Sequence, residues 1–254
     1  MTAGAYDRLA PHYRDYARRR AAYCDAVDAR VREWCGGSVD GMLDVGSGDG
    51  SRAVRLAASL GVSRLVLSEP SAAMAALCRE HAGVRVWSCA AEHLPDGPER
   101  FQVVTCLWHV LGAIDGAARR TSALGRMAAA LAPGGRLLID LPNRYNGAAA
   151  GAWRAGLRRL RDTLRPSDEN GVVRFTWQVN GAAIPAAGYL FTREQVHKLA
   201  RAAGLVVEHE VFLDYDTGAE RGPWTGQLVL ALRPSWRGDG AAAGRARPAS
   251  TRLV

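Results

Sequence analysis

Short apolar runs alternate with helix-length amphipathic stretches from residue 41 to residue 140. Apolar runs of about four to eight residues predict strands, and apolar positions that recur every three to four residues predict helices. The expected strands are 42–45, 65–68, 84–88, 103–106 and 136–140, and the expected helices are 52–60, 72–81 and 117–131. Strands joined by crossover helices form right-handed β-α-β units. The pattern therefore predicts an α/β fold with a doubly wound, mostly parallel sheet.

After residue 140 the next periodic segment is an amphipathic helix. Its apolar residues recur at helical spacing and are Trp153, Leu157, Leu160 and Leu164. Arginines occupy several of the other positions between 154 and 165. Such an arginine-rich face is typical of a solvated helix surface, with an anionic substrate or a membrane surface as the alternative.

The remainder of the chain is rich in strand patterns. The β-rich runs are 172–179, 182–191, 206–213 and 227–232. Asn180-Gly181 favours a hairpin turn between the first two runs. Thr192 and Gln195 have the spacing of a capping box, which predicts a helix that ends at Gly204. The last two runs are joined by a short loop, so we expect them to pair antiparallel.

The distribution of charge bears on the class of partner. The formal net charge is +8, but residues 153–166 hold five arginines and one aspartate, and residues 235–254 hold four arginines and one aspartate. These two segments supply nearly all of the net charge. A nucleic-acid groove spreads basic and aromatic residues over a continuous surface, so this distribution argues against a nucleic-acid partner.

The cysteines and the apolar runs bear on the compartment. Five cysteines, an odd number without a C-x-x-C spacing, imply neither a disulfide framework nor a zinc site. The histidines and acids do not cluster at ligand spacing, so we expect no metal. The longest apolar run, 103–114, is too short to span a bilayer, and the N-terminus has no signal-peptide core. We expect a cytoplasmic protein without a membrane partner.

Three glycines follow the first expected strand. Gly46, Gly48 and Gly50 let the backbone turn tightly and approach a ligand at the start of the next helix. This turn alone is compatible with a dinucleotide pyrophosphate, although that fingerprint has Gly or Ala where this chain has Ser51.

Two acids lie beside the glycine turn. Glu69 follows the second strand, where a carboxylate accepts hydrogen bonds from both hydroxyls of a ribose. Asp44 lies two residues before Gly46, and its charge disfavours a pyrophosphate but suits an ammonium or sulfonium cation.

Further motifs follow in a fixed order along the chain. They are Leu-Asp-Val-Gly-x-Gly-x-Gly at 43–50, Glu-Pro-Ser at 69–71, Ala-Glu-x-Leu-Pro at 91–95, Phe-x-x-Val at 101–104 and Leu-x-Pro-Gly-Gly at 131–135, preceded by Tyr-Asp-x-x-Ala-x-x-Tyr at 6–13. In this combination the chain resembles the class I S-adenosylmethionine-dependent methyltransferases, above all the branch that acts on small molecules. Two departures stand out. Gln102 replaces an Asp common in the family, and Ala90 replaces the Asp that often reads adenine.

The resemblance implies a Rossmann-like sheet of seven strands, with the last strand antiparallel, and a lid of helices and a β-hairpin. The implied parts are an N-terminal helical lid (1–36), a cofactor-binding core (37–140), a substrate lid insertion (141–188), the completion of the core by strands six and seven (189–234) and a disordered tail (235–254).

The resemblance also implies S-adenosylmethionine as the cofactor and a set of residues that bind it. These are Tyr13, Asp44, Gly46, Ser47, Gly48, Glu69, Pro70, Met74, Ala91, Glu92, Cys106 and Leu107. In this interpretation Glu69 holds the ribose, Asp44 pairs with the amino group, Tyr13 closes over the methionine end, and an arginine from 18–20 meets the carboxylate.

The methyl acceptor is expected beyond the fourth and fifth strands. The expected substrate-binding residues are Trp108, Asn143, Tyr145 and Trp224. His109 is the candidate general base, although a histidine within an apolar run is often a core residue. Asn143 and Tyr145 have a second interpretation as anchors of the lid.

The predicted function is transfer of a methyl group to a nitrogen or oxygen atom of a small molecule, a specialised metabolite. Three alternatives stay open at this point: a nucleic-acid methyltransferase, a nicotinamide-dependent oxidoreductase and a non-catalytic protein that binds the cofactor. The sequence does not indicate an oligomeric state, and a homodimer is compatible with it.

Overall fold

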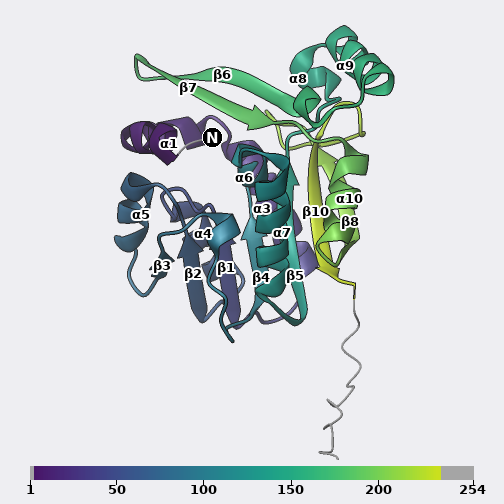
Figure 1. Ribbon diagram of the computed structural model, residues 1–254. Helices are drawn as coiled ribbons and strands as arrows, with labels where there is room; N and C mark the ends of the chain where they lie inside the picture. The colour runs from purple at the N-terminus through teal and green to yellow at the C-terminus, as the bar shows by residue number, and fades with distance from the viewer. Residues whose placement is uncertain (1–2, 236–254) are drawn as a thin grey trace, which may run out of the picture.

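The structure is a computed structural model that describes residues 3–235 of the chain (Figure 1). Its central sheet has eight strands in the order β3-β2-β1-β4-β5-β10-β8-β9. The strands are β1 (Gly41–Val45), β2 (Arg64–Ser68), β3 (Arg85–Trp87), β4 (Phe101–Cys106), β5 (Leu131–Leu141), β8 (Leu205–Leu213), β9 (Glu220–Arg221) and β10 (Gln227–Pro234). Strands β1 to β5 run parallel, and β10 pairs antiparallel with both β5 and β8. The predicted mostly parallel sheet with an antiparallel last strand is confirmed.

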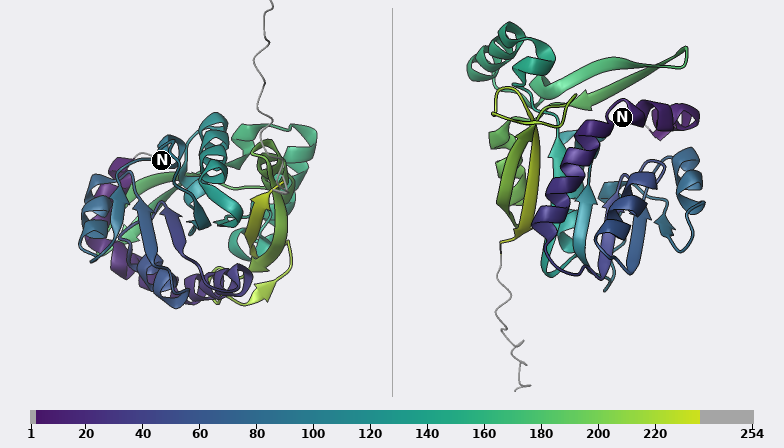
Figure 2. Two further views of the ribbon diagram at one scale, coloured as in Figure 1. Left: turned by 90° about the horizontal axis from the view of Figure 1, so that it is seen from below. Right: turned by 180° about the vertical axis from the view of Figure 1, so that it is seen from behind.

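Helices cover both faces of this sheet (Figure 2). One face packs against α7 (Ala117–Ala129) and α10 (Arg193–Ala202), and the other packs against α3 (Ala21–Cys35) and α4 (Ser51–Ser59). Strand β5 contributes to both cores: Leu137 belongs to the first and its neighbour Leu138 to the second. Successive strand residues point to opposite faces, which explains why the central strands are mostly apolar on both faces. Exceptions are Asp44, Thr105 and Asp140, which lie toward the carboxyl ends of β1, β4 and β5.

A second layer lies over the carboxyl ends of the parallel strands. It consists of α1 (Ala3–Leu9), η1 (Ala10–His12), α2 (Tyr13–Arg18), α6 (Val110–Ala113), α8 (Gly147–Ala150), α9 (Ala152–Leu164), η3 (Asp168–Gly171) and the hairpin of β6 (Val172–Val179) and β7 (Ala182–Tyr189). Figure 1 shows the hairpin extending above α1, which in turn lies above α5 (Ala72–Arg79). Leu9, Met74, Trp177 and Ile184 form a small buried core that joins these elements.

Several element boundaries differ from the sequence predictions. Helix α7 ends at Ala129 and β5 already begins at Leu131, five residues before the expected start. A Cβ on Gly135 would lie 2.9 Å from the carbonyl oxygen of Phe101. The glycine therefore lets β5 approach β4 closely enough to pair along this stretch.

Five short elements were not predicted: β9, α6, α8, η2 (Ala91–His93) and η3. Strand β9 makes the sheet eight-stranded rather than seven-stranded, and two residues are too few to show a period. The capping box of Thr192 and Gln195 is confirmed. The expected division into lid and core segments stays a prediction, and the expected tail lies outside the described residues from residue 236 onward. Within residues 3–235, no helix combines the length and apolarity needed to cross a membrane.

Candidate active site

Two cavities open at the carboxyl ends of β1, β2 and β4, where ligands bind in open α/β sheets. The larger has a volume of about 520 Å³, and the smaller has a volume of about 300 Å³. Four residues line both cavities: Tyr13, Gly46, Leu107 and Trp108. The two cavities are therefore neighbouring parts of one site, with Tyr13 and Trp108 at their boundary.

The glycine turn forms the floor between the two cavities. Gly46 and Gly48 have φ angles of +74° and +58°, which favour glycine. A Cβ on Gly48 would lie 2.4 Å from the phenolic oxygen of Tyr13, and a Cβ on Gly46 would lie 2.4 Å from a methyl group of Val110. Both glycines are thus required by their backbone conformation and by the side chains that close over them.

Glu69 lies on the floor of the larger cavity at the end of β2. Its Oε2 accepts a hydrogen bond of 2.9 Å from the Gly48 amide, and its Oε1 accepts one of 2.9 Å from the Ser71 amide. A carboxylate has about four acceptor positions, so each oxygen keeps one for a ligand hydroxyl. Burial of this side chain raises the pKa of Glu69 to about 7, and the two amide hydrogen bonds oppose the shift.

Asp44 and Arg52 line the smaller cavity. Asp44 accepts a hydrogen bond from the hydroxyl of Thr105, and burial raises the pKa of its carboxyl. Arg52 donates from Nε to Asp28 at 2.8 Å and from Nη2 to the carbonyl of Cys24 at 3.3 Å. Among the described residues, its Nη1 is the one buried side-chain nitrogen or oxygen without a hydrogen-bond partner. A buried unpaired N–H is costly, and a ligand carboxylate would satisfy it.

His109 lines the larger cavity and belongs to a buried polar cluster. Its Nε2 lies 3.3 Å from the hydroxyl of Tyr23 and 3.5 Å from Oδ2 of Asp140. Tyr23 donates a hydrogen bond of 2.6 Å to the same Asp140 oxygen. Burial lowers the pKa of His109, while the charge of Asp140 opposes the shift. The imidazole is therefore neutral at pH 7 and able to accept a proton.

The backbone around His109 is strained. Trp108 and His109 both have left-handed conformations, with φ angles of +62° and +66°. Oδ1 of Asp140 accepts a hydrogen bond from the Trp108 amide, and the ring of Tyr215 stacks on His109 with a centroid distance of 5.1 Å. Residues held in such conformations cluster at functional sites.

Aromatic side chains from three distant segments form the roof of the larger cavity. Tyr16 stacks on Trp108 with a centroid distance of 5.3 Å and meets Trp177 of the hairpin edge-on at 5.9 Å. The ring centroid of Tyr6 lies 5.3 Å from that of Trp177. Phe175, which is on β6 like Trp177, also lines the cavity. Sequence reasoning missed Tyr16, Phe175 and Trp177 as cavity residues. For Phe175 and Trp177, the strand pattern of 172–179 does not reveal which face of the strand meets the core.

The side of the cavity near β3 contains Pro70, Ala91 and Glu92. Arg119 also lines it and donates from Nε to Oε1 of Glu92 at 2.7 Å. The carboxylate of Glu92 is therefore already engaged by an ion pair. Arg119 was not singled out from the sequence.

Five of the expected site residues line neither cavity. They are Met74, Cys106, Asn143, Tyr145 and Trp224. Met74 and Cys106 are core residues in the structure. Among the expected residues, Asp44 and Ser47 line the smaller cavity alone.

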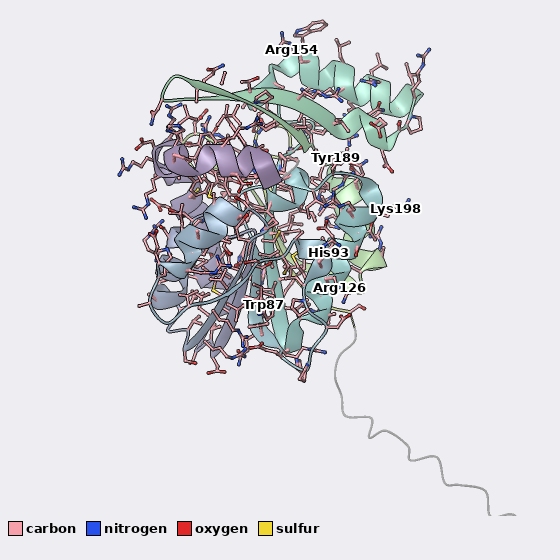
Figure 3. All side chains as sticks on the ribbon, turned by 60° about the vertical axis from the view of Figure 1, so that its left-hand side comes forward. Trp87, His93, Arg126, Arg154, Tyr189 and Lys198 are labelled. Atoms are coloured by element: carbon pink, nitrogen blue, oxygen red, sulfur yellow. The ribbon has the colours of Figure 1, made fainter. Side chains whose placement is uncertain are left out.

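Asn143 and Tyr145 hold the lid segment instead. Nδ2 of Asn143 donates to the carbonyls of Pro223 and Gly226, and the Tyr145 hydroxyl donates to Asp162 of α9 at 2.8 Å. Between them, the buried Arg144 contacts Asp162 and the hydroxyl of Tyr189, the last residue of β7 at the base of the hairpin (Figure 3). The interpretation of this segment as a lid anchor fits these contacts.

Comparisons with known proteins bear on the domain and on the fold. Residues 42–135 match the family described as "Methyltransferase domain". No curated protein matches the chain. Among solved structures, the CcbJ methyltransferase from Streptomyces caelestis is similar with a TM-score of 0.60 and 16% identity, over 84% of this chain and 90% of that chain.

Two further solved structures have the same fold. CalS10, an amino pentose methyltransferase from Micromonospora echinaspora involved in calicheamicin biosynthesis, has a TM-score of 0.59 and 20% identity, over 87% of this chain and 96% of that chain. An S-adenosylmethionine-dependent methyltransferase from Clostridium acetobutylicum has a TM-score of 0.64 and 12% identity, over 91% of this chain and 99% of that chain.

The fold and the domain match together define the class. The protein is an S-adenosylmethionine-dependent methyltransferase, and its cofactor is S-adenosylmethionine. The site fits this cofactor, since the cavities offer free acceptor positions on Glu69 for a ribose and the unpaired Nη1 of Arg52 for a carboxylate. The nicotinamide alternative is set aside.

Proposed function

We propose that the enzyme transfers a methyl group to a nitrogen or oxygen atom of a small molecule, a specialised metabolite. The observation that carries the proposal is the larger cavity, in which Glu69 and the glycine turn share one space with His109 and an aromatic roof. Such a space suits a small acceptor placed between the floor and the roof. The similarity to CalS10, a methyltransferase of calicheamicin biosynthesis, supports this class of acceptor.

In this proposal the bound cofactor extends from the larger cavity into the smaller one. Glu69 accepts the ribose hydroxyls in the larger cavity, with Pro70 and Ala91 beside the adenine. In the smaller cavity Asp44 meets the amino group and Arg52 meets the carboxylate. When bound, S-adenosylmethionine supplies an electrophilic methyl group on a positively charged sulfur. Orientation of the acceptor toward this methyl group is the main task of the protein, worth up to about 7–11 kcal/mol of the barrier.

His109 is the general base when the acceptor is a hydroxyl. Its neutral imidazole lines the acceptor cavity, and Asp140 lies on the Nε2 side, where it stabilises the imidazolium formed by proton transfer. A neutral amine needs little help from a base. The dependence of the reaction on His109 therefore reports which atom is methylated.

A small molecule is favoured over nucleic acid as the acceptor. The cavity is covered by the hairpin and by the N-terminal helices, so a base would have to leave its strand and pass beneath this cover. We also place the enzyme in the cytoplasm, because all five cysteines are free, as expected in a reducing compartment.

The test is a methyl-transfer assay with isotopically labelled cofactor. Matched pairs of small phenols, alcohols, amines and amino sugars are offered alongside single-stranded DNA and RNA, and products are identified by mass. The proposal predicts label on an oxygen or nitrogen of a small molecule. Transfer to nucleic acid alone, or to no acceptor while the cofactor binds, would contradict it; the second result would favour the non-catalytic alternative.

A further inference from the structure

Helix α9 has its apolar face turned away from the protein. Its large apolar side chains are exposed: Trp153 by 70%, Leu157 by 47%, Leu160 by 54% and Leu164 by 69%. At about 100° per residue these four side chains fall within an arc of about 60°. The opposite side of the helix carries Ala155, which is buried, and Asp162, which pairs with Arg144 at 3.0 Å. Amphipathic helices of globular proteins normally bury the apolar stripe.

The exposed stripe is bordered by basic side chains. Of the five arginines of this segment, Arg154, Arg161 and Arg165 lie beside the stripe. Arg158 instead donates to the carbonyl of Arg144 at 3.3 Å, and Arg159 lies over the ring of Trp224. Asp162 is the one acid among residues 152–165, and it faces Arg144 and Tyr145 rather than the outer surface. Figure 3 shows Arg154 at the outer edge of the molecule. The outward face therefore combines an apolar ridge with a strong positive charge.

The charge favours an anionic occupant over a second copy of this chain. Two such helices facing each other would bring the three arginines beside each stripe, Arg154, Arg161 and Arg165, against those of the other copy. A stable protein interface also uses about 20–30 residues on each side, whereas α9 has 13 residues and only one outward face. Neither of the two cavities includes a residue of α9, so the ridge does not border either of them.

We infer that α9 is a docking helix for an anionic lipid surface. A ridge of tryptophan and leucine with arginines beside it is the pattern of a helix that lies in the plane of a membrane interface. A bilayer accepts a convex ridge without a complementary groove, and each arginine near an anionic surface adds to the attraction. The helix lies on the surface, in keeping with the finding that no helix among the described residues can span a bilayer.

This inference does not depend on the proposed acceptor. Helix α9 contributes no side chain to either cavity, so its exposed residues can be changed without touching the cofactor floor or the aromatic roof. The expectation of no membrane partner rested on the lack of a spanning segment, while a membrane surface stayed open as an alternative for this arginine-rich helix. The exposure of the apolar stripe, visible only in the fold, favours that alternative.

The test is sedimentation of the full-length protein with vesicles. Vesicles of phosphatidylcholine are compared with vesicles that contain phosphatidylglycerol as well. We expect binding to the anionic vesicles only, weakened at least about tenfold by Leu157→Ser with Leu160→Ser, and severalfold by Arg161→Glu. The matched controls are Leu157→Met with Leu160→Met, and Arg201→Glu on α10, which should bind like the wild type. S-adenosylhomocysteine affinity, which should stay unchanged, verifies folding.

Three results would overturn the inference. The first is no binding of the wild type to anionic vesicles. The second is binding that survives both the serine pair and Arg161→Glu, because the attraction would then come from another surface. The third is that the wild type does not bind vesicles but forms a dimer in solution, and that the serine pair dissociates this dimer. A second copy of the chain would then cover the ridge.

Discussion

The floor and the roof of the larger cavity are built in different ways. The floor consists of the glycine turn and Glu69, which are held by backbone amides at the ends of β1 and β2. The roof consists of Tyr6, Tyr16 and Trp177, which are held by contacts between their rings. The floor is polar and comes from two short motifs of the sequence, whereas the roof is aromatic and comes from segments that are far apart in the sequence. From this contrast we propose that the floor binds the constant partner, the cofactor, and that the roof contacts the variable partner, the acceptor.

If this division is correct, the two surfaces are separable by mutation. Changes in the floor should alter cofactor affinity and leave acceptor recognition nearly intact. Changes in the roof should do the reverse. The residues at the boundary, above all His109, should affect the chemical step while leaving the binding of the cofactor product intact.

The largest effect is expected for His109→Asn. Asparagine tolerates the left-handed conformation at this position, so the backbone turn is retained while the base is lost. With a hydroxyl acceptor, kcat should fall about 10²–10⁴-fold, whereas S-adenosylhomocysteine affinity should not change. Steady-state kinetics and calorimetry measure the two quantities. Unchanged kcat with a hydroxyl acceptor would remove His109 from the chemistry.

Glu69→Ala should affect the floor alone. Loss of the hydrogen bonds to the ribose should weaken S-adenosylhomocysteine binding by about 1.5–3 kcal/mol, which is roughly a 10- to 150-fold rise in Kd. The acceptor KM, measured at saturating cofactor, should stay within a factor of about two. The conservative variant Glu69→Gln keeps the size of the side chain and separates charge from shape.

Cofactor affinity should also depend on pH. Burial raises the pKa of Glu69 to about 7, and the ionised carboxylate is the better acceptor for ribose hydroxyls. Affinity for S-adenosylhomocysteine should therefore increase about tenfold from pH 6 to pH 8, and the increase should be absent in Glu69→Gln. A flat profile in the wild type would show that Glu69 is ionised throughout.

The raised pKa of Glu69 also affects the stability of the fold, and this effect has the opposite dependence on pH. Between the ordinary pKa of 4.5 and about 7, the folded protein retains a proton that the unfolded chain has released. Stability of the cofactor-free protein should therefore fall as the pH rises through this window. Denaturant titrations of wild type and Glu69→Gln at about pH 5 and pH 8 measure the difference.

The smallest effect is expected for Phe175→Ala in the roof. Its ring is 41% exposed and lines the larger cavity, so its loss should cost little stability. The acceptor KM should rise about threefold to tenfold through the loss of apolar contact. S-adenosylhomocysteine affinity should remain that of the wild type, and a change in that affinity would mean that the roof also holds the cofactor.

The floor could be predicted from the sequence because its residues lie in two short motifs. Gly46, Gly48 and Glu69 follow strands whose patterns are strong, and parallel strands bring their carboxyl ends to one edge. The order of the strand and helix patterns likewise predicted the sheet. Arg52 escaped notice because a single arginine in the first turn of a helix has no signature until its burial is known.

The resemblance implied the two lid segments, but the side chains that form the roof could not be predicted, for the same physical reason that distinguishes the roof from the floor. Trp177 becomes a cavity residue only because the hairpin packs on α1, and no local pattern encodes that contact. Asn143 and Trp224 were expected at the acceptor, since they lie near the correct end of the sheet. Instead, Asn143 donates hydrogen bonds within the lid anchor, and the exposed ring of Trp224 lies beside it, with its centroid 6.2 Å from that of Tyr145.

The most direct test of the division between floor and roof is one series of calorimetric titrations. S-adenosylhomocysteine is titrated into cofactor-stripped wild type, Glu69→Ala and Phe175→Ala under the same conditions. We expect micromolar binding to the wild type, a Kd at least about tenfold higher for Glu69→Ala, and an unchanged Kd for Phe175→Ala. Equal affinities for the wild type and Glu69→Ala, or a similar loss in both variants, would contradict the assignment of the cofactor to the floor.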